Sequence, residues 1–136
     1  MTPEFVDTNI FIYAETPGDA EKHPKAIRLL ERLVEERSGA LSTQVLTEFY
    51  STGTAKLHMS SQEAEYVIRR LADWKLHRPD HSSVLRAAEL HRRYKFQWWD
   101  ALIVNSALEL GCSILWTEDL RHGQRIGGLT VRNPFA

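Results

Sequence analysis

Apolar residues along the chain follow two alternating patterns. Short apolar runs bounded by turn-forming residues predict strands at residues 4–9, 39–44, 75–79, 112–117 and 129–133. Between them, apolar residues recur at helical spacing over residues 10–14, 20–37, 43–57, 60–72, 80–91 and 97–110. Short strands separated by helices predict an α/β fold, in which a mainly parallel sheet is covered by helices on both faces.

Individual residues define the ends and faces of these helices. Ser60 and Glu63 have the spacing of a capping box, in which each side chain bonds the backbone N–H of the other residue. Gly111 is expected to end the helix over 97–110. The helix over 20–37 is expected to pack on the core through Ala26, Ile27, Leu30, Leu33 and Val34. For the helix that begins near residue 80, the expected inner residues are Val84, Ala87, Ala88 and either Leu90 or His91.

Composition limits the class of protein. The chain has 136 residues, of which 43% are hydrophobic and 26% are charged, so we expect one folded domain over residues 1–136. No apolar run is long enough to span a membrane, and the N-terminus lacks the features of a signal peptide. Cys112 is the only cysteine, which excludes an internal disulfide and a zinc site of clustered cysteines. These features favour a cytoplasmic protein.

The charge balance does not by itself indicate a partner. The net charge is −1, whereas a strongly basic domain would favour nucleic-acid binding. Lysine and arginine do gather locally, over residues 69–78 and 91–95. These segments are interpreted either as solvated helix faces or as a binding patch.

Four acidic residues occupy special places in the predicted fold. Asp7 follows the first strand, and Asp119 follows the strand over 112–117. Because the carboxyl ends of parallel strands share one edge of the sheet, these two residues are expected on the same rim. Glu48 and Asp100 lie near the starts of predicted helices and can lean over that rim.

Each acid also has an ordinary structural explanation when it is taken alone. Asp7 can cap a helix or form a turn, and Asp119 can be a turn residue. Glu48 can be a surface glutamate. Asp100 can be a first-turn acid favoured by the helix dipole, although its neighbours on that helix face are apolar.

Convergence of these carboxylates would require a cation between them. Two carboxylates about 4 Å apart repel by roughly 4 kcal/mol at an effective dielectric constant of about 20, and the net stability of a domain is only about 5–15 kcal/mol. Hard oxygen ligands without a cysteine or histidine cluster favour Mg²⁺ or Mn²⁺. Mg²⁺ keeps several of its waters, one of which can attack a phosphate. The pattern therefore predicts metal-assisted hydrolysis of phosphodiester bonds.

Four segments of the chain carry a family resemblance. They are FVDTNIFIYA at 5–14, STQVLTEFY at 42–50, WWDALIVNSALELGCSILWTEDLRHGQ at 98–124 and GGLTVRNPF at 127–135. In this order they resemble the PIN-domain ribonucleases, and most closely the VapC-type toxins of bacterial toxin–antitoxin pairs. The resemblance implies a three-layer α/β/α sandwich with a parallel sheet of about five short strands.

The resemblance also implies a metal centre and partners. One or two Mg²⁺ or Mn²⁺ ions would be held by Asp7, Glu48, Asp100 and Asp119. The polar residues that match those bracing the acids are Thr8, Asn9 and Thr117. Thr117 can equally be an ordinary strand-end threonine. Family members cut single-stranded stretches of structured RNA, often tRNA or ribosomal RNA, usually form homodimers, and are silenced by a cognate antitoxin that covers the active-site groove.

The loop after the fourth predicted strand adds further candidates. Glu118 can join the acidic cluster or face solvent. Arg121, His122 and Gln124 are candidates to contact substrate phosphates, although this segment also fits an exposed loop. In the expected reaction the acids position the metal and one carboxylate, from Asp100 or Glu48, takes the proton of the attacking water.

Three other functions fit parts of the pattern. A metal-dependent DNA or flap nuclease would share the acidic rim, but the chain is short for an added DNA-clamping element. A phosphoacceptor receiver domain also has aspartates at strand ends, but it needs a lysine at the end of a late strand, which residues 112–120 lack. A non-catalytic RNA- or protein-binding scaffold would make the acids dispensable.

Aromatic residues near the acids have two interpretations. Phe11, Tyr13, Phe49 and Tyr50 are expected in the core, and some of them can instead line a groove for an antitoxin helix. Such a partner is expected to bring an arginine or lysine toward the acids. Trp98 and Trp99 are expected to anchor the start of their helix, or one of them can stack on RNA bases.

Overall fold

A computed structural model describes residues 2–136, which form six helices and six strands. The strands are β1 (Glu4–Val6), β2 (Gly39–Ser42), β3 (Lys75–His77), β4 (Ile114–Trp116), β5 (Arg125–Ile126) and β6 (Leu129–Arg132). The helices are α1 (Thr8–Ala14), α2 (Lys22–Glu36), α3 (Thr43–Lys56), α4 (Ser61–Arg70), α5 (His81–Tyr94) and α6 (Trp98–Glu109). Each predicted strand and helix therefore has a counterpart, and none of the helices in the described residues could span a membrane.

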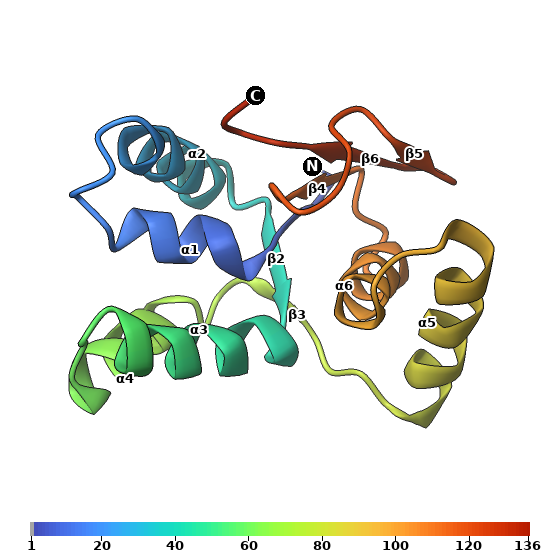
Figure 1. The fold of residues 1–136 in the computed structure, drawn as a ribbon, viewed down its shortest axis with the longest axis horizontal. Coiled ribbons are helices and arrows are strands. Elements are labelled where there is room, and N and C mark those ends of the chain that lie inside the picture. Colours follow the sequence, from blue (N-terminus) through green and yellow to red (C-terminus); the bar gives the residue numbers. More distant parts are fainter. Residues whose placement is uncertain (1) are drawn as a thin grey trace.

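The strands form a mainly parallel sheet in the order β3-β2-β1-β4-β6-β5. Only β5 runs antiparallel, in a hairpin with β6. Helices α1 and α2 lie on one side of the strands and α5 and α6 on the other, while α3 and α4 lie beside α1 (Figure 1). The predicted α/β fold with helices on both faces is confirmed. The short strand β5 was not predicted, because two residues give no alternating pattern to detect.

The order of the strands creates one special position in the sheet. From β1 the chain adds β2 and β3 on one side and later places β4 on the other side of β1. The connections that leave the carboxyl ends of β1 and β4 therefore diverge, which opens a crevice at that edge. In open parallel sheets this topological switch point is where ligands bind.

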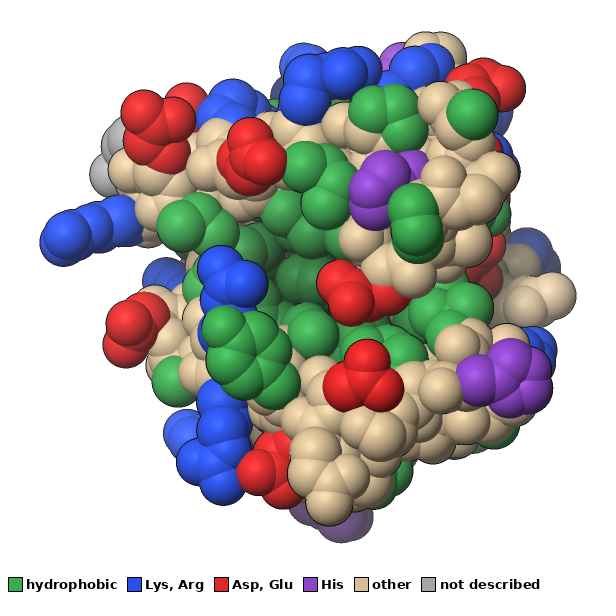
Figure 2. All heavy atoms as spheres, turned by 90° about the vertical axis from the view of Figure 1, so that its left-hand side faces the viewer, with side chains coloured by type: hydrophobic (Ala, Val, Ile, Leu, Met, Phe, Trp, Pro, Cys, Tyr) green, Lys and Arg blue, Asp and Glu red, His purple; other side chains and the backbone are tan. Residues whose placement is uncertain are grey.

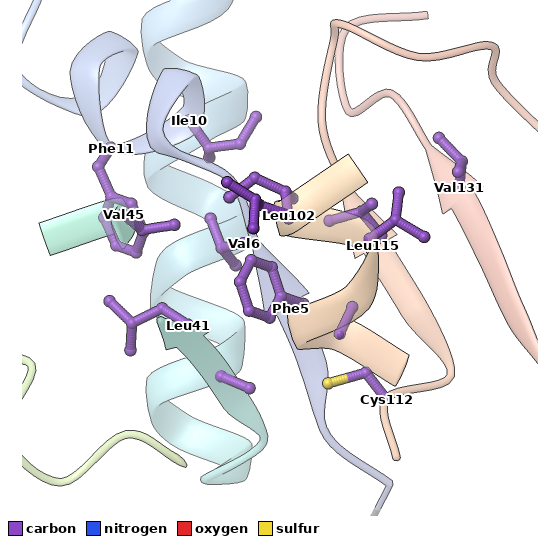
Figure 3. Close-up of a cluster of buried hydrophobic side chains, with 14 of the residues drawn as sticks. Phe5, Val6, Ile10, Phe11, Leu41, Val45, Leu102, Cys112, Leu115 and Val131 are labelled. Atoms are coloured by element: carbon purple, nitrogen blue, oxygen red, sulfur yellow. The ribbon is translucent and has the colours of Figure 1, made fainter. Parts of the chain in front are cut away.

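The core fills the space between the sheet and its helices. Phe5, Val6 and Leu115 of the central strands are fully buried and meet side chains from α1, α3 and α6 (Figure 3). All seven residues 101–107 of α6 are buried, so this helix is covered on every side. A helix buried all round cannot rotate without exposing apolar surface. The core therefore fixes the orientation of the residues in its first turn.

Local capping signals end the helices where the sequence predicts. Ser60 and Glu63 form the expected capping box. Asp80 caps α5, and its side chain accepts a hydrogen bond from the backbone N–H of Ser83. Gly111 follows α6 with a φ of +71°, a backbone conformation that glycine adopts without steric cost.

Two residues predicted to face the core are exposed. Val34 is 60% exposed and Val84 is 45% exposed, so both predictions are wrong. On each helix the buried face is narrower than the face on which the sequence places apolar residues. Each valine directly follows a buried residue, and one residue corresponds to a rotation of about 100° around the helix axis. On α5 the buried neighbour is Ser83, whose hydroxyl is bonded to Asp80 and Glu109.

The aromatic residues divide between core and surface. Phe11 and Phe49 are buried and lie edge to face, with ring centroids 6.5 Å apart. Tyr13 is partly buried, whereas Tyr50 is exposed and bonds Ser61. The prediction that these four residues belong to the core is therefore confirmed for the phenylalanines and wrong for Tyr50.

Gly39 on β2 supports a prediction about packing. A Cβ at this position would lie 2.5–2.6 Å from three carbon atoms of the Trp74 ring. Because Trp74 also contacts Phe11, with ring centroids 5.6 Å apart, the indole has little freedom to move away. Gly39→Ala is expected to lower the free energy of unfolding by about 1–3 kcal/mol, measured by urea denaturation. Gly18→Ala, where nothing lies within 4 Å of the added Cβ, is the control and should have little effect. Equal stability of the two variants would contradict the close approach.

Candidate metal centre

Three carboxylates meet at the switch point of the sheet. Asp7 directly follows β1, Asp119 lies just beyond β4, and Asp100 lies in the first turn of α6. One carboxylate oxygen from each of the three lies within 4.8 Å of the others. The fold thus brings Asp7 together with two acids that lie more than ninety positions further along the sequence, as the strand pattern predicts.

Asp7 is the buried member of the cluster. Its Oδ1 accepts a hydrogen bond of 2.7 Å from the backbone N–H of Thr8, and its Oδ2 accepts one of 2.8 Å from the Thr117 hydroxyl. Burial raises the pKa of Asp7 from 3.8 to about 7, although these two hydrogen bonds favour the charged form. The charges of Asp119 and Glu48 raise the pKa further. Asp7 is also the N-cap of α1. Its raised pKa means that ionising its carboxyl group costs free energy in the folded protein.

Asp100 is half-buried, and its carboxylate has no hydrogen-bond donor among residues 2–136 that would stabilise its charge. Burial raises the pKa of Asp100 from 3.8 to about 6, and the nearby charges of Asp119 and Glu48 add to the effect. Since α6 is buried on all sides, the backbone holds this carboxylate at the crevice against the repulsion.

Thr117 links the two strand ends that carry the other acids. Its hydroxyl donates to Asp7 and accepts a 3.1 Å hydrogen bond from the backbone N–H of Asp119. The Asn9 amide donates to Asp119 Oδ2 at 3.0 Å and to the Thr117 hydroxyl at 3.4 Å. Thr117 is fully buried, so its hydroxyl is a fixed bridge between β1 and β4. The structure thus places Asn9 and Thr117 in hydrogen-bond contact with the acids that the resemblance expects them to brace, and their role in the site stays a prediction.

Glu48 lies beside the three aspartates but is held by its own partners. Its Oε2 accepts a hydrogen bond of 3.2 Å from the Thr8 hydroxyl, and its Oε1 accepts one of 2.8 Å from the Gln44 amide. It lines the same groove as the aspartates, and its charge raises the pKa of Asp7 and of Asp100. Gln44 was missed at the sequence level; its place one helical turn before Glu48 is the signal that could have found it.

Glu118 lies outside the cluster. Its Oε1 forms an ion pair of 3.0 Å with Lys22 and accepts a hydrogen bond of 3.2 Å from the Tyr13 hydroxyl. The side chain therefore neither joins the metal centre nor lies free in solvent. It ties the loop that carries Asp119 to helices α1 and α2.

The three loop residues proposed to contact substrate lie away from the acids. Arg121 and His122 are exposed, and His122 accepts a hydrogen bond of 2.9 Å from the backbone N–H of Asn133. The backbone of Gln124 is bonded to Arg121 and Val131. None of the three lines the hollows next to the acids among the described residues. Their role in substrate binding stays a prediction.

Two hollows adjoin the acids. One is a groove of about 810 Å³, with Trp99, Val84, Leu102 and Ile103 among its lining residues. The other is a hollow of about 490 Å³ that includes Lys95, Phe96 and Leu120. Gln97, Asp100 and Asp119 line both. A ligand at the acids would therefore have space in both hollows.

A divalent cation fits this centre. The donor atoms are all carboxylate oxygens, which Mg²⁺ and Mn²⁺ prefer. Burial raises the pKa of Asp7 and of Asp100, and repulsion from the charges of Asp119 and Glu48 adds to the effect, so the ionised forms of these two residues cost free energy. A cation among the three carboxylate oxygens would remove that repulsion.

Solved structures with a similar fold come from toxin–antitoxin systems. A toxin–antitoxin complex from Klebsiella pneumoniae has a TM-score of 0.69 and 22% identity, over 96% of this chain and 97% of that chain. VapC20 of Mycobacterium tuberculosis, described as a sarcin-ricin loop cleaving toxin, has a TM-score of 0.65 and 21% identity, over 82% and 85% of the two chains. VapBC2 of Rickettsia felis, bound to a DNA fragment from its promoter, has a TM-score of 0.67 and 21% identity, over 96% and 97%. At these identities the likeness establishes a shared fold.

The sequence itself gives the family. No curated relative matches the chain. The PIN domain family, in contrast, matches residues 5–127, a range that includes all four acids and every residue that braces them. Because this match spans most of the chain, the protein belongs to the PIN domain family, as its sequence motifs predict.

Proposed function

We propose that the protein is a metal-dependent endoribonuclease that acts as the toxin of a type II toxin–antitoxin pair. The observation that carries this proposal is the group of three carboxylate oxygens within 4.8 Å of one another at the switch point of a PIN domain. Toxin–antitoxin proteins among the structures of similar fold support the biological role. The sarcin-ricin loop cleaved by VapC20 supports RNA as the substrate class.

In the proposed centre Asp7, Asp100 and Asp119 hold Mg²⁺ or Mn²⁺, and Glu48 borders the site from α3. A bound divalent ion supplies Lewis-acid stabilisation of the charge that develops on the phosphate. The protein chain holds the carboxylates in position. Thr117 fixes the two strand-end acids relative to each other, and the buried helix α6 fixes Asp100.

The proposal includes a protein partner. An apolar groove of about 420 Å³ lies between α1, α2 and α4, where Phe11, Leu30 and Val67 are among its lining residues. Figure 2 shows hydrophobic side chains lining a hollow on this face, with charged side chains around its border. We propose that an amphipathic helix of the antitoxin covers this groove. A homodimer and a cytoplasmic location follow from the family resemblance and the RNA substrate, and both belong to the proposal.

The central test is cleavage of RNA. The purified protein is expected to cleave total tRNA or ribosomal RNA with Mg²⁺ or Mn²⁺, and to lose this activity in EDTA. Asp100→Asn should lower the cleavage rate by at least about a hundredfold, because it removes one of the three clustered carboxylates. The measurement is the initial rate of product formation on denaturing gels.

Two controls define that test. Asp73→Asn changes an exposed acid far from the cluster and should leave the rate unchanged. Single-stranded DNA of matched sequence, run beside the RNA, identifies a DNA nuclease if it is the better substrate. Cleavage that survives both EDTA and Asp100→Asn would contradict a metal-dependent mechanism at these acids.

The raised pKa of Asp100 predicts a pH-dependent stability. Its pKa is about 6 in the folded protein and 3.8 when unperturbed, so between these values the folded state binds more protons than the unfolded state. The contribution of Asp100 to the stability of the metal-free protein therefore becomes less favourable as the pH rises from about 4 to about 6, and it stays unfavourable above that range. Asp100→Asn should raise the Tm of the metal-free protein by a few degrees at pH 8 and by almost nothing at pH 4.

Mg²⁺ is expected to stabilise the wild-type protein more than Asp100→Asn. At pH 8 it should raise the Tm of the wild-type protein more than that of Asp100→Asn, because binding to the folded state stabilises it. Thermal scans with and without EDTA measure both effects. A lower Tm for metal-free Asp100→Asn than for the wild type at pH 8 would show that the Asp100 charge is not destabilising.

The antitoxin groove is tested at Val34, which lines it and is 60% exposed. Val34→Glu should weaken binding of the antitoxin by at least about tenfold, because an apolar helix would bury an unpaired charge. The candidate partner is the product of a small reading frame next to the gene, and isothermal titration measures its affinity. Leu85→Glu, an equally exposed position on α5, is the control. Equal affinities of the two variants would place the partner elsewhere.

A further inference from the structure

Trp99 is the exposed tryptophan next to the acidic cluster. Its side chain is 65% exposed, whereas Trp74, Trp98 and Trp116 are partly buried against the core. Trp98, one residue earlier, packs edge to face on His91 with ring centroids 6.2 Å apart. Within residues 2–136 the Trp99 ring has no aromatic or cationic side chain against it. Tryptophan is highly buried on average, so an indole left open in this way needs an explanation.

The position of Trp99 ties it to the cluster. It directly precedes Asp100 in the first turn of α6, and consecutive Cα atoms are about 3.8 Å apart. Its backbone carbonyl accepts a hydrogen bond of 3.4 Å from the Gln44 amide, which also bonds Glu48 at 2.8 Å. The indole therefore stands on the same buried helix that fixes Asp100, rather than on a mobile loop.

The surroundings of Trp99 suit a flat apolar group. It lines the 810 Å³ groove together with Val84, Leu102 and Ile103, and Val84 is itself 45% exposed. The second hollow shares Gln97, Asp100 and Asp119 with this groove and adds the cationic side chain of Lys95, beside Phe96 and Leu120. A nucleotide combines a planar base, which suits the apolar residues of the groove, with a charged phosphate, which Lys95 attracts.

We propose that Trp99 is a stacking platform for the base of the nucleotide that flanks the scissile phosphate. The phosphate lies at the acids, the backbone continues past Lys95, and the base turns into the groove against the indole. Stacking requires an unpaired base, so Trp99 selects a single-stranded or flipped-out nucleotide at the cleavage site. This inference rests on the proposed function, since it assigns the substrate to the same centre.

The test uses a fluorescein-labelled single-stranded RNA decamer and a decamer of the same length in which every base is removed. Fluorescence anisotropy measures the dissociation constants in Ca²⁺, with intact RNA verified on a gel after each titration. Trp99→Ala should bind the normal decamer between about 5-fold and about 150-fold more weakly than the wild type. Trp99→Phe should recover most of the loss, whereas Trp99→Leu, which is apolar but has no aromatic face, should not.

The matched controls separate stacking from other effects. Wild type and Trp99→Ala should bind the abasic decamer with equal affinity, because the indole then has no base to contact. Tyr66→Ala removes an aromatic side chain that is 61% exposed and lies outside the groove, and it should bind both decamers like the wild type. Circular dichroism verifies that all variants are folded.

Several results would overturn the inference. They are unchanged binding by Trp99→Ala, full recovery by Trp99→Leu, an equal loss in Tyr66→Ala, or no binding of the normal decamer by the wild type. Sedimentation velocity adds another: a dimer that dissociates in Trp99→Ala while RNA affinity is unchanged would assign the indole to a protein interface.

Failure of the proposed function gives a different result. A wild-type protein that binds RNA through Trp99 but cleaves no RNA with Mg²⁺ or Mn²⁺ would contradict the nuclease and leave the stacking platform intact. A protein that cleaves RNA equally well with Trp99→Ala and with wild type, and binds it equally, would contradict the platform alone.

Discussion

The repulsion among carboxylates at the switch point is the constraint on which the rest of the site depends. Asp7, Asp100 and Asp119 lie together although burial and the charges of neighbouring acids raise the pKa of Asp7 and of Asp100. Such a cluster does not arise from packing preference, because separate exposed acids would cost the fold less. The backbone must therefore hold them in place. Two devices do so: the Thr117 hydroxyl between β1 and β4, and the helix α6, whose residues 101–107 are all buried.

The sequence predicts the parts of this arrangement that local patterns encode. Strand ends followed by aspartates, together with the parallel sheet, place Asp7 and Asp119 on one rim. Capping chemistry likewise predicts the ends of α4 and α6, at Ser60 and Gly111. These features succeed because hydrogen bonds within a few residues decide them. What the pattern cannot give is the distance between carboxylates from different elements, which tertiary packing sets.

The wrong predictions share a physical origin. Val34 and Val84 belong to apolar stripes in the sequence, yet both are exposed beside grooves. Periodicity detects an apolar face but not whether the partner that covers it is in the same chain. Glu118 is the polar counterpart, since its ion pair with Lys22 joins residues 96 positions apart and no local signal reveals it. The two valines therefore lie on the surfaces that the proposed substrate and partner would cover, whereas Glu118 is held by a contact within the chain.

The proposed nuclease would act on a polyanionic substrate although the protein has a net charge of −1. Without a cation the acidic cluster repels phosphate, so divalent metal governs both approach and reaction in the proposed nuclease. Affinity that does not depend on charge must then come from elsewhere in the groove. In the proposed complex the exposed indole of Trp99, on the helix that fixes Asp100, provides this affinity, since stacking on a base is insensitive to the sign of the surrounding field. Under this proposal the acids determine where the phosphate reacts, and the apolar residues of the groove determine which nucleotide is presented to them.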